Sequence, residues 1–135
     1  SAYRLVAAPS LSIIPQRHGM DCAVACLAMI CGVSYEQALM AFRHNVYSAG
    51  ATIAQIRQAA RAIGPGFNLS WSRKVDDLSE ATGILCVSSA KWPNDHLVII
   101  KEDQIIDTDA TLWDADVFMA AYEARPISIL RIKED

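Results

Sequence analysis

The N-terminal half of the chain has the hydrophobic periodicity of helices. Residues 22–31 (CAVACLAMIC) are apolar on every side, which is typical of a central helix that is buried all round. Asp21 is the candidate N-cap of this helix, and Gly32 is its stop. An extended segment over residues 10–15, which ends at a proline, leads into it.

Two capping boxes predict the next helices. Ser34 with Gln37 opens a helix that runs to about Arg43, and Thr52 with Gln55 opens another that ends near Ile63. The second half changes to the period-2 alternation of strands, predicted at residues 67–72, 83–87, 96–100, 105–108 and 127–132. Short helices are expected at 76–81 and 114–122. Helices followed by antiparallel strands predict an α+β fold, with N-terminal helices packed on a C-terminal antiparallel sheet.

Composition and charge narrow the class of protein. A chain of 135 residues, 53% hydrophobic and 20% charged, fits one globular domain over residues 1–135. A net charge of −3 argues against a nucleic-acid partner. Apolar runs stay well below the ~18 residues of a membrane span. Residues 1–4 lack the layout of a signal peptide, so we expect a cytoplasmic protein, with a removed secretion leader left open and the oligomeric state undetermined.

The cysteine pattern predicts reduced thiols. Three of the four cysteines, at positions 22, 26 and 31, fall in one predicted helix, and Cys86 lies in a strand. A disulfide framework spreads its cysteines over loops, and these spacings are not those of structural zinc sites. A metal site built from Cys22, Cys26 and His18 would lack a second ligand pair. We therefore expect no metal and no cofactor.

Cys22 is the candidate nucleophile. It lies in the first turn of a helix, where unpaired N–H groups and the helix dipole favour a thiolate. The alternative is a core cysteine, since Cys26 and Cys31 show that the helix uses cysteine as filler. His96 opens an apolar strand and is the preferred base. His18 precedes Cys22 closely, and His44 lies in a loop that we expect to be solvated.

The base requires an orienting acid, and acyl chemistry requires oxyanion donors. If the loop within residues 101–104 has an even number of residues, Asp107 and Asp109 share the face of His96. The parity of the loop does not decide whether Asp107 or Asp109 is the orienting acid. Gln16 lies six residues before Cys22 in the loop that leads to the helix, where its amide could be an oxyanion donor beside the Cys22 N–H.

Together these residues resemble a known family. Residues 16–30 (QRHGMDCAVACLAMI) resemble the signature of the double-glycine leader peptidases, papain-like cysteine proteases known from bacteriocin-exporting transporters and from stand-alone relatives. The likeness continues through residues 50–52, 96–100 and 105–107. Two positions depart from the family pattern: Ala23 stands where the family usually has Gly, and Thr108 where it usually has Pro. The chain is similar to the stand-alone type.

The resemblance implies a papain-like fold and roles for individual residues. Cys22 would be the nucleophile, His96 the base and acid, Asp107 the residue that orients the imidazole, and Gln16 part of the oxyanion hole. The implied function is a cysteine peptidase that hydrolyses a peptide or isopeptide bond of a peptide or protein substrate through a thioester. Two alternatives share the scaffold: a deamidase or acyltransferase that uses the same residues, and a peptide-binding module without activity.

Overall fold

A computed structural model describes residues 11–132. Ser10, at the start of the predicted extended segment, and residues 1–4, on which the leader prediction rests, lie outside the described residues. The helices and strands follow in the order α1 (Cys22–Cys31), α2 (Tyr35–Ala41), α3 (Val46–Ala49), α4 (Ile53–Ile63), β1 (Leu69–Ser72), β2 (Thr82–Ser89), β3 (His96–Lys101), β4 (Gln104–Ile106), β5 (Leu112–Asp114), α5 (Ala115–Tyr122) and β6 (Ala124–Ile132).

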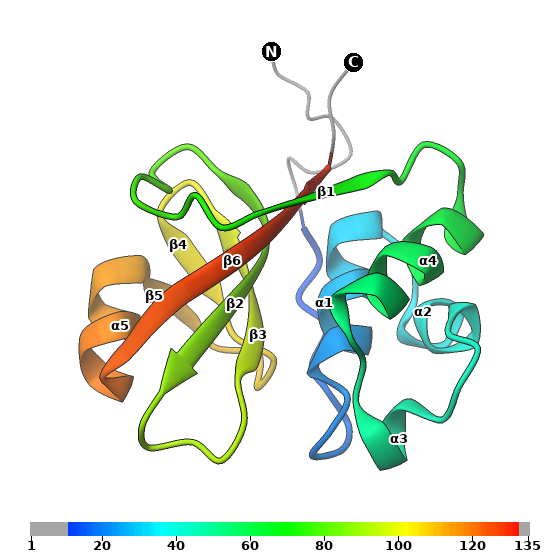
Figure 1. The fold of residues 1–135 in the computed structure, drawn as a ribbon, viewed down its shortest axis with the longest axis horizontal. Helices are drawn as coiled ribbons and strands as arrows, with labels where there is room; N and C mark the ends of the chain where they lie inside the picture. The colour runs from blue at the N-terminus through cyan, green and yellow to red at the C-terminus, as the bar shows by residue number, and fades with distance from the viewer. Residues whose placement is uncertain (1–10, 133–135) are drawn as a thin grey trace.

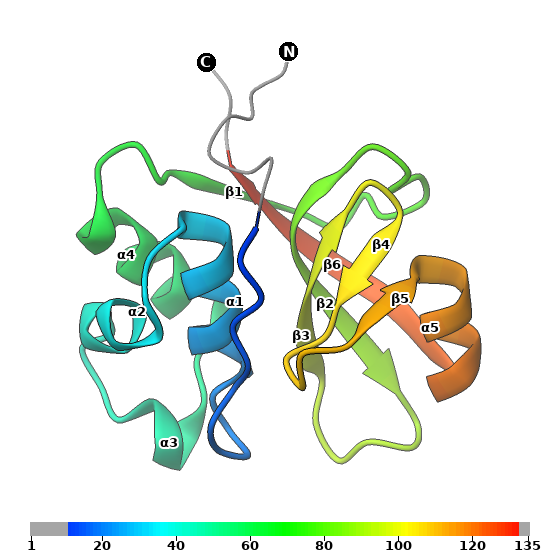
Figure 2. The same cartoon turned by 180° about the vertical axis from the view of Figure 1, so that it is seen from behind.

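The elements form two halves (Figures 1 and 2). Helices α1 to α4 gather on one side and make the helical half. Strands β2 to β6, with α5 on their outer face, make the sheet half, and β1 crosses from one half to the other (Figure 1). Helices thus pack on a six-stranded antiparallel sheet, which confirms the predicted α+β class.

The sheet has the strand order β1-β6-β2-β3-β4-β5, and β3 is buried on both faces. Leu97 and Ile99 point into a core shared with the helices, whereas Val98 and Ile100 point into a second core under α5. This explains the unbroken apolar run after His96, because a strand covered on both faces has no solvent side. The base candidate therefore begins a strand that is buried on both faces.

Helix α1 forms over the predicted residues, and all but Cys22 are buried. Gly32 ends it in a left-handed conformation with φ of 68°, and its N–H donates to Ala28. Asp21 lies at the N-cap position as predicted, but its side chain makes no capping bond to α1. Asp21 is fully buried, and its carboxylate binds groups that precede and follow the helix instead.

Both predicted capping boxes are present, at Ser34 and at Thr52. Helix α2 ends at Ala41 rather than near Arg43. Helix α3, which was not predicted, is a single turn capped by the Asn45 side chain. The helix predicted at 76–81 does not form, because the Asp77 carboxylate accepts bonds from the main chain and hydroxyl of Ser79 and stabilises a turn there.

The β3–β4 hairpin closes through a two-residue turn, Glu102–Asp103, in which both residues have positive φ. Its register pairs Ile100 with Ile105, so the loop is even-numbered, as the parity argument required. Strand β6 begins before the predicted residue 127, because Pro126 is accommodated where the register with β2 shifts. The short edge strand β5 was not predicted.

Candidate active site

A cleft of about 590 Å³ runs between the two halves. Its helical wall consists mainly of small or unbranched residues, and its sheet wall carries the aromatic and titratable side chains. The helical wall comprises Gly19, Met20, Cys22, Ala23, Ala49, Gly50, Ala51, Thr52 and Ile53. The sheet wall comprises Cys86, Trp92, Pro93, Asn94, Asp95, His96, Leu97, Asp107 and Tyr122. Three of the four predicted site residues, Cys22, His96 and Asp107, line this one cleft.

Cys22 is the half-buried first residue of α1, at the cleft. The other thiols are in less reactive environments. Burial raises the pKa of Cys26 well above its usual value, that of Cys31 to about 12 and that of Cys86 to about 11. Cys26 and Cys31 are core residues, as the sequence indicated. The cleft therefore offers Cys22 as its best-placed thiol.

A buried carboxylate holds the loop that precedes α1. The two oxygens of Asp21 accept the N–H groups of Arg17 and His18, at 2.8 and 2.9 Å, and the hydroxyl of Tyr35. Burial opposes ionisation of Asp21, but these hydrogen bonds outweigh it and lower the pKa of the carboxyl group. A second hydroxyl, that of Tyr47, lies 2.9 Å from the Tyr35 oxygen. The carboxylate thus determines the approach of the chain to Cys22.

His96 pairs with Asp107 across the hairpin. The Nε2 atom lies 2.8 Å from Asp107 Oδ1, and the His96 side chain keeps 26% of its surface exposed. Burial lowers the pKa of His96, but the hydrogen bonds to Asp107 and Cys22 and the charges of both residues raise it to about 9. Because Nε2 is bonded to Asp107, Nδ1 is the ring nitrogen left for the hydrogen bond to Cys22. These contacts favour an imidazolium beside the sulfur.

The other titratable candidates lie elsewhere. Asp109 is exposed and binds the main chain and hydroxyl of Thr111, so Asp107 is the acid that contacts His96. His18 stacks on Tyr47, with ring centroids 4.0 Å apart. The expectation of a solvated His44 was wrong: it is half-buried, and its Nε2 lies 2.7 Å from the carbonyl oxygen of Gly50. His44 thereby holds part of the helical wall.

Gln16 is not among the residues that line the cleft, but it lies at the junction of the two halves. Its main-chain N–H donates to the carbonyl of Thr108 at 2.8 Å, and its Oε1 accepts the Thr108 hydroxyl. Its Nε2 donates to the carbonyl of His18, at 2.5 Å, and lies 3.4 Å from Asp21 Oδ1. The side-chain amide therefore spans from the end of β4 to the loop before α1.

Sequence reasoning missed an aromatic contact to the base. The Trp92 ring meets the His96 ring edge-on, with centroids 5.7 Å apart, and also packs on Tyr122 and Phe118 under α5. Trp92 covers part of the imidazole and contributes to its burial. A tryptophan in a polar loop, four residues before a histidine, was the available signal.

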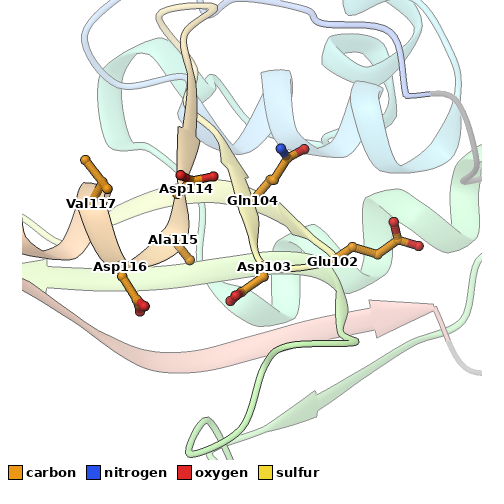
Figure 3. A pocket seen from close by; sticks show the side chains of 7 residues that line it. All are labelled: Glu102, Asp103, Gln104, Asp114, Ala115, Asp116 and Val117. Carbon is orange, nitrogen blue, oxygen red and sulfur yellow. The ribbon is translucent and has the colours of Figure 1, made fainter.

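A second hollow, of about 600 Å³, lies at the hairpin turn and the start of α5 (Figure 3). Its side chains include the carboxylates of Glu102, Asp103, Asp114 and Asp116, with no thiol and no imidazole among them. Within residues 11–132, no group of three or more His, Cys, Asp or Glu is arranged to hold a metal ion. Of the helices described, none alone could cross a membrane; only α1 and α2 together, bent by 111°, meet the length and hydropathy limits.

The chain is similar to known proteins in its sequence profile and in its fold. The profile of the Peptidase C39 family matches residues 10–118. Among solved structures, the chain is similar to a double glycine motif protease from an AMS/PCAT transporter, crystallised in complex with the leader peptide. The TM-score is 0.61 at 20% identity, and the match covers 92% of this chain and 93% of the other. No curated protein sequence matches significantly.

Proposed function

We propose that this chain, which belongs to the Peptidase C39 family and is a cysteine peptidase, hydrolyses a peptide bond with Cys22 as nucleophile, His96 as base and acid, and Asp107 as the orienting group. The observation that carries the proposal is one cleft lined by a thiol at a helix start and by an imidazole that is hydrogen-bonded to a buried carboxylate. This set of groups can form and break an acyl-enzyme.

In the proposed reaction the Cys22 thiolate attacks the scissile carbonyl carbon, and a tetrahedral oxyanion forms. The imidazolium of His96 gives its proton to the leaving amine, the C–N bond breaks, and a thioester remains on the sulfur. His96 then takes a proton from water, which attacks the thioester and releases the carboxylate product and the thiolate. Asp107 keeps Nε2 occupied throughout, so Nδ1 faces the reacting atoms.

We also propose that Gln16 donates to the oxyanion together with the main-chain N–H of Cys22. The distance from Gln16 Nε2 to Asp21 Oδ1 is long, at 3.4 Å. Of the two hydrogens on Nε2, the one directed to Asp21 is therefore more available to an oxyanion than the one bonded to His18. The amide lies in the loop that leads directly to Cys22, and removal of an oxyanion donor costs about 10²–10³ in kcat in other hydrolases. A substrate must therefore displace the Asp21 contact and bring its oxyanion toward this amide.

The proposed substrate is a peptide segment in extended conformation. Small residues on the helical wall, among them Ala23, Ala49, Gly50 and Ala51, leave space for a peptide main chain close to the sulfur. The similar transporter protease was crystallised with a leader peptide. A double-glycine leader is accordingly the first substrate to test.

The test compares Cys22→Ala with Cys86→Ala, because both thiols line the cleft. Peptides with a double-glycine site are incubated with each variant, and the products are identified by mass spectrometry. We expect Cys22→Ala to lower kcat at least about a thousandfold without a change in thermal unfolding, and Cys86→Ala to keep turnover. Retained cleavage by Cys22→Ala would refute the proposal. Conversion of Gln to Glu in an uncleaved peptide would instead identify a deamidase.

Alkylation provides a second readout at the same residue. Near neutral pH, iodoacetamide should label Cys22 before the other three cysteines, because burial raises the pKa values of Cys26, Cys31 and Cys86. Peptide mapping of partly labelled protein measures the order. Equal slow labelling of all four residues would contradict the proposed nucleophile.

A further inference from the structure

Thr108 lies against the proposed catalytic residues without belonging to them. It is 1% exposed, and its main-chain N–H donates to Asp107 Oδ1 at 2.7 Å. The same oxygen receives His96 Nε2 at 2.8 Å. A proline at this position would lack the N–H and could not make the first bond. Thr108 thus adds a second donor to the oxygen that orients the imidazole.

The Thr108 hydroxyl has a definite direction. It donates its proton to Gln16 Oε1, and its Oγ1 lies 3.5 Å from His96 Nε2. The hydroxyl proton therefore points toward the amide and the lone pairs are free to face the imidazole. One buried hydroxyl links a side chain of the loop before α1 to the His96–Asp107 pair, across 92 residues of sequence.

This bond selects one orientation of the Gln16 amide. With Oε1 on the Thr108 hydroxyl, Nε2 is directed to the carbonyl of His18 and to Asp21, on the side where α1 begins. The flipped amide would place its oxygen against a carbonyl and a carboxylate, both of which are acceptors. The main-chain bond from Gln16 to Thr108 already joins the two segments, so the hydroxyl is not required to hold them together. Its specific contribution is to orient the amide.

We propose that Thr108 is a positioning residue, which holds the Asp107 carboxylate through its N–H and the Gln16 amide through its hydroxyl, so that base and oxyanion donor are oriented together. This inference rests on the proposed function, since it assigns Thr108 a purpose in that reaction. It also makes a prediction about the resting protein, because the hydroxyl lies beside His96 whether or not a peptide is cleaved.

The experiment compares Thr108→Val, Thr108→Ser and Thr111→Val. Valine keeps the shape and the main-chain N–H and removes the hydroxyl, serine restores the hydroxyl, and Thr111→Val makes the same change at an exposed position away from the cleft. We expect Thr108→Val to lower kcat about tenfold with KM within about twofold. Thr108→Ser and Thr111→Val should stay within about twofold of wild type. Thermal unfolding, recorded in parallel, identifies a variant that loses activity by unfolding.

The resting protein supplies the readout that does not depend on turnover. NMR titration of His96 should show a lower pKa in Thr108→Val and the wild-type pKa in Thr108→Ser, because an acceptor beside the imidazolium is removed and restored. Unchanged titration and unchanged kcat in folded Thr108→Val would overturn the inference, as would equal losses in Val and Ser variants. If the wild-type protein cleaves no peptide, the proposed function fails, and the titration alone decides whether Thr108 orients these groups.

Discussion

The helical half and the sheet half of the molecule position their reactive groups in different ways. Cys22 starts a helix whose apolar surface is buried on every side, and the preceding loop is held by the Asp21 carboxylate. His96 and Asp107 belong to different segments of the sheet half, and they meet only because β3 and β4 pair in one register. The thiol is thus placed by nearby sequence, whereas the imidazole and its acid are placed by strand pairing.

This difference implies that structural changes in the two halves affect the active site differently. A change in the helical half that leaves α1 folded keeps Cys22 at a helix start, because the preceding loop and the first turn define that position. A one-residue slip between β3 and β4 would move Asp107 to the opposite face from His96. The apolar pairs Ile99–Ile106 and Ile100–Ile105 oppose such a slip, since each face is buried in a different core. The base therefore depends on the sheet core more than the nucleophile does.

The largest expected effect is a contrast between two histidines, one in the sheet half and one in the helical half. His96→Ala should lower kcat about a thousandfold, because the thiolate loses its proton donor and acceptor. His44→Ala removes contacts to the Gly50 carbonyl and to the Phe42 ring in the helical half and should raise KM about fivefold. Steady-state kinetics of both variants, with circular dichroism as the folding control, measures the contrast. Similar losses in the two variants would contradict the assignment of the base.

The next largest effect concerns Asp107 and the dependence of activity on pH. The pKa of His96 in the folded protein, about 9, lies above its ordinary value of 6.5. The protonated imidazolium therefore contributes fully to the stability of the folded protein below about pH 6.5, and this contribution is lost as the pH rises through about 9. The alkaline limb of kcat/KM, which reports the free enzyme, should accordingly lie near pH 9. Asp107→Asn should lower kcat about a hundredfold and move this limb toward lower pH.

Asp109→Asn is the matched control, because Asp109 is exposed and bonds only locally to Thr111. It should leave both kcat and the alkaline limb at their wild-type values. Thermal unfolding between pH 6.5 and 9 gives the same comparison without substrate: the wild-type melting temperature should decline more than that of Asp107→Asn. A shifted limb in Asp109→Asn instead would transfer the orienting role to that residue.

The smallest effect on activity, and a clear one on stability, is expected from glycine substitutions. A Cβ on Gly83 would lie 2.2 Å from the carbonyl oxygen of Leu130, so alanine forces β2 and β6 apart. We expect Gly83→Ala to lower the free energy of unfolding by about 3 kcal/mol. Gly66, between α4 and β1, has open space around it, and Gly66→Ala should change stability by less than about 1 kcal/mol. Urea unfolding of both variants measures the difference, and equal stabilities would show that the sheet yields as readily as the loop.

Much of the fold follows from local signals in the sequence. The apolar run at residues 22–31, the stop at Gly32 and both capping boxes predict α1, α2 and α4, because these interactions join residues at most a few positions apart. A local signal was misleading at Asp77, where the side chain stabilises a turn in place of the expected helix. Helix α3 and strand β5 were not predicted, because elements of three or four residues depend on contacts with neighbouring elements.

The sequence by itself determined that a cysteine begins a buried helix and that a histidine begins a buried strand, and parity limited the orienting acid to Asp107 or Asp109. Only the tertiary structure decided that Asp107 contacts His96, that the side chain of Asp21 holds the loop before α1, and that Gln16 contacts Thr108. The physical reason is the range of each interaction. Helix signals act within a turn or two, whereas contacts between the two halves depend on strand register and on loops that close over tens of residues.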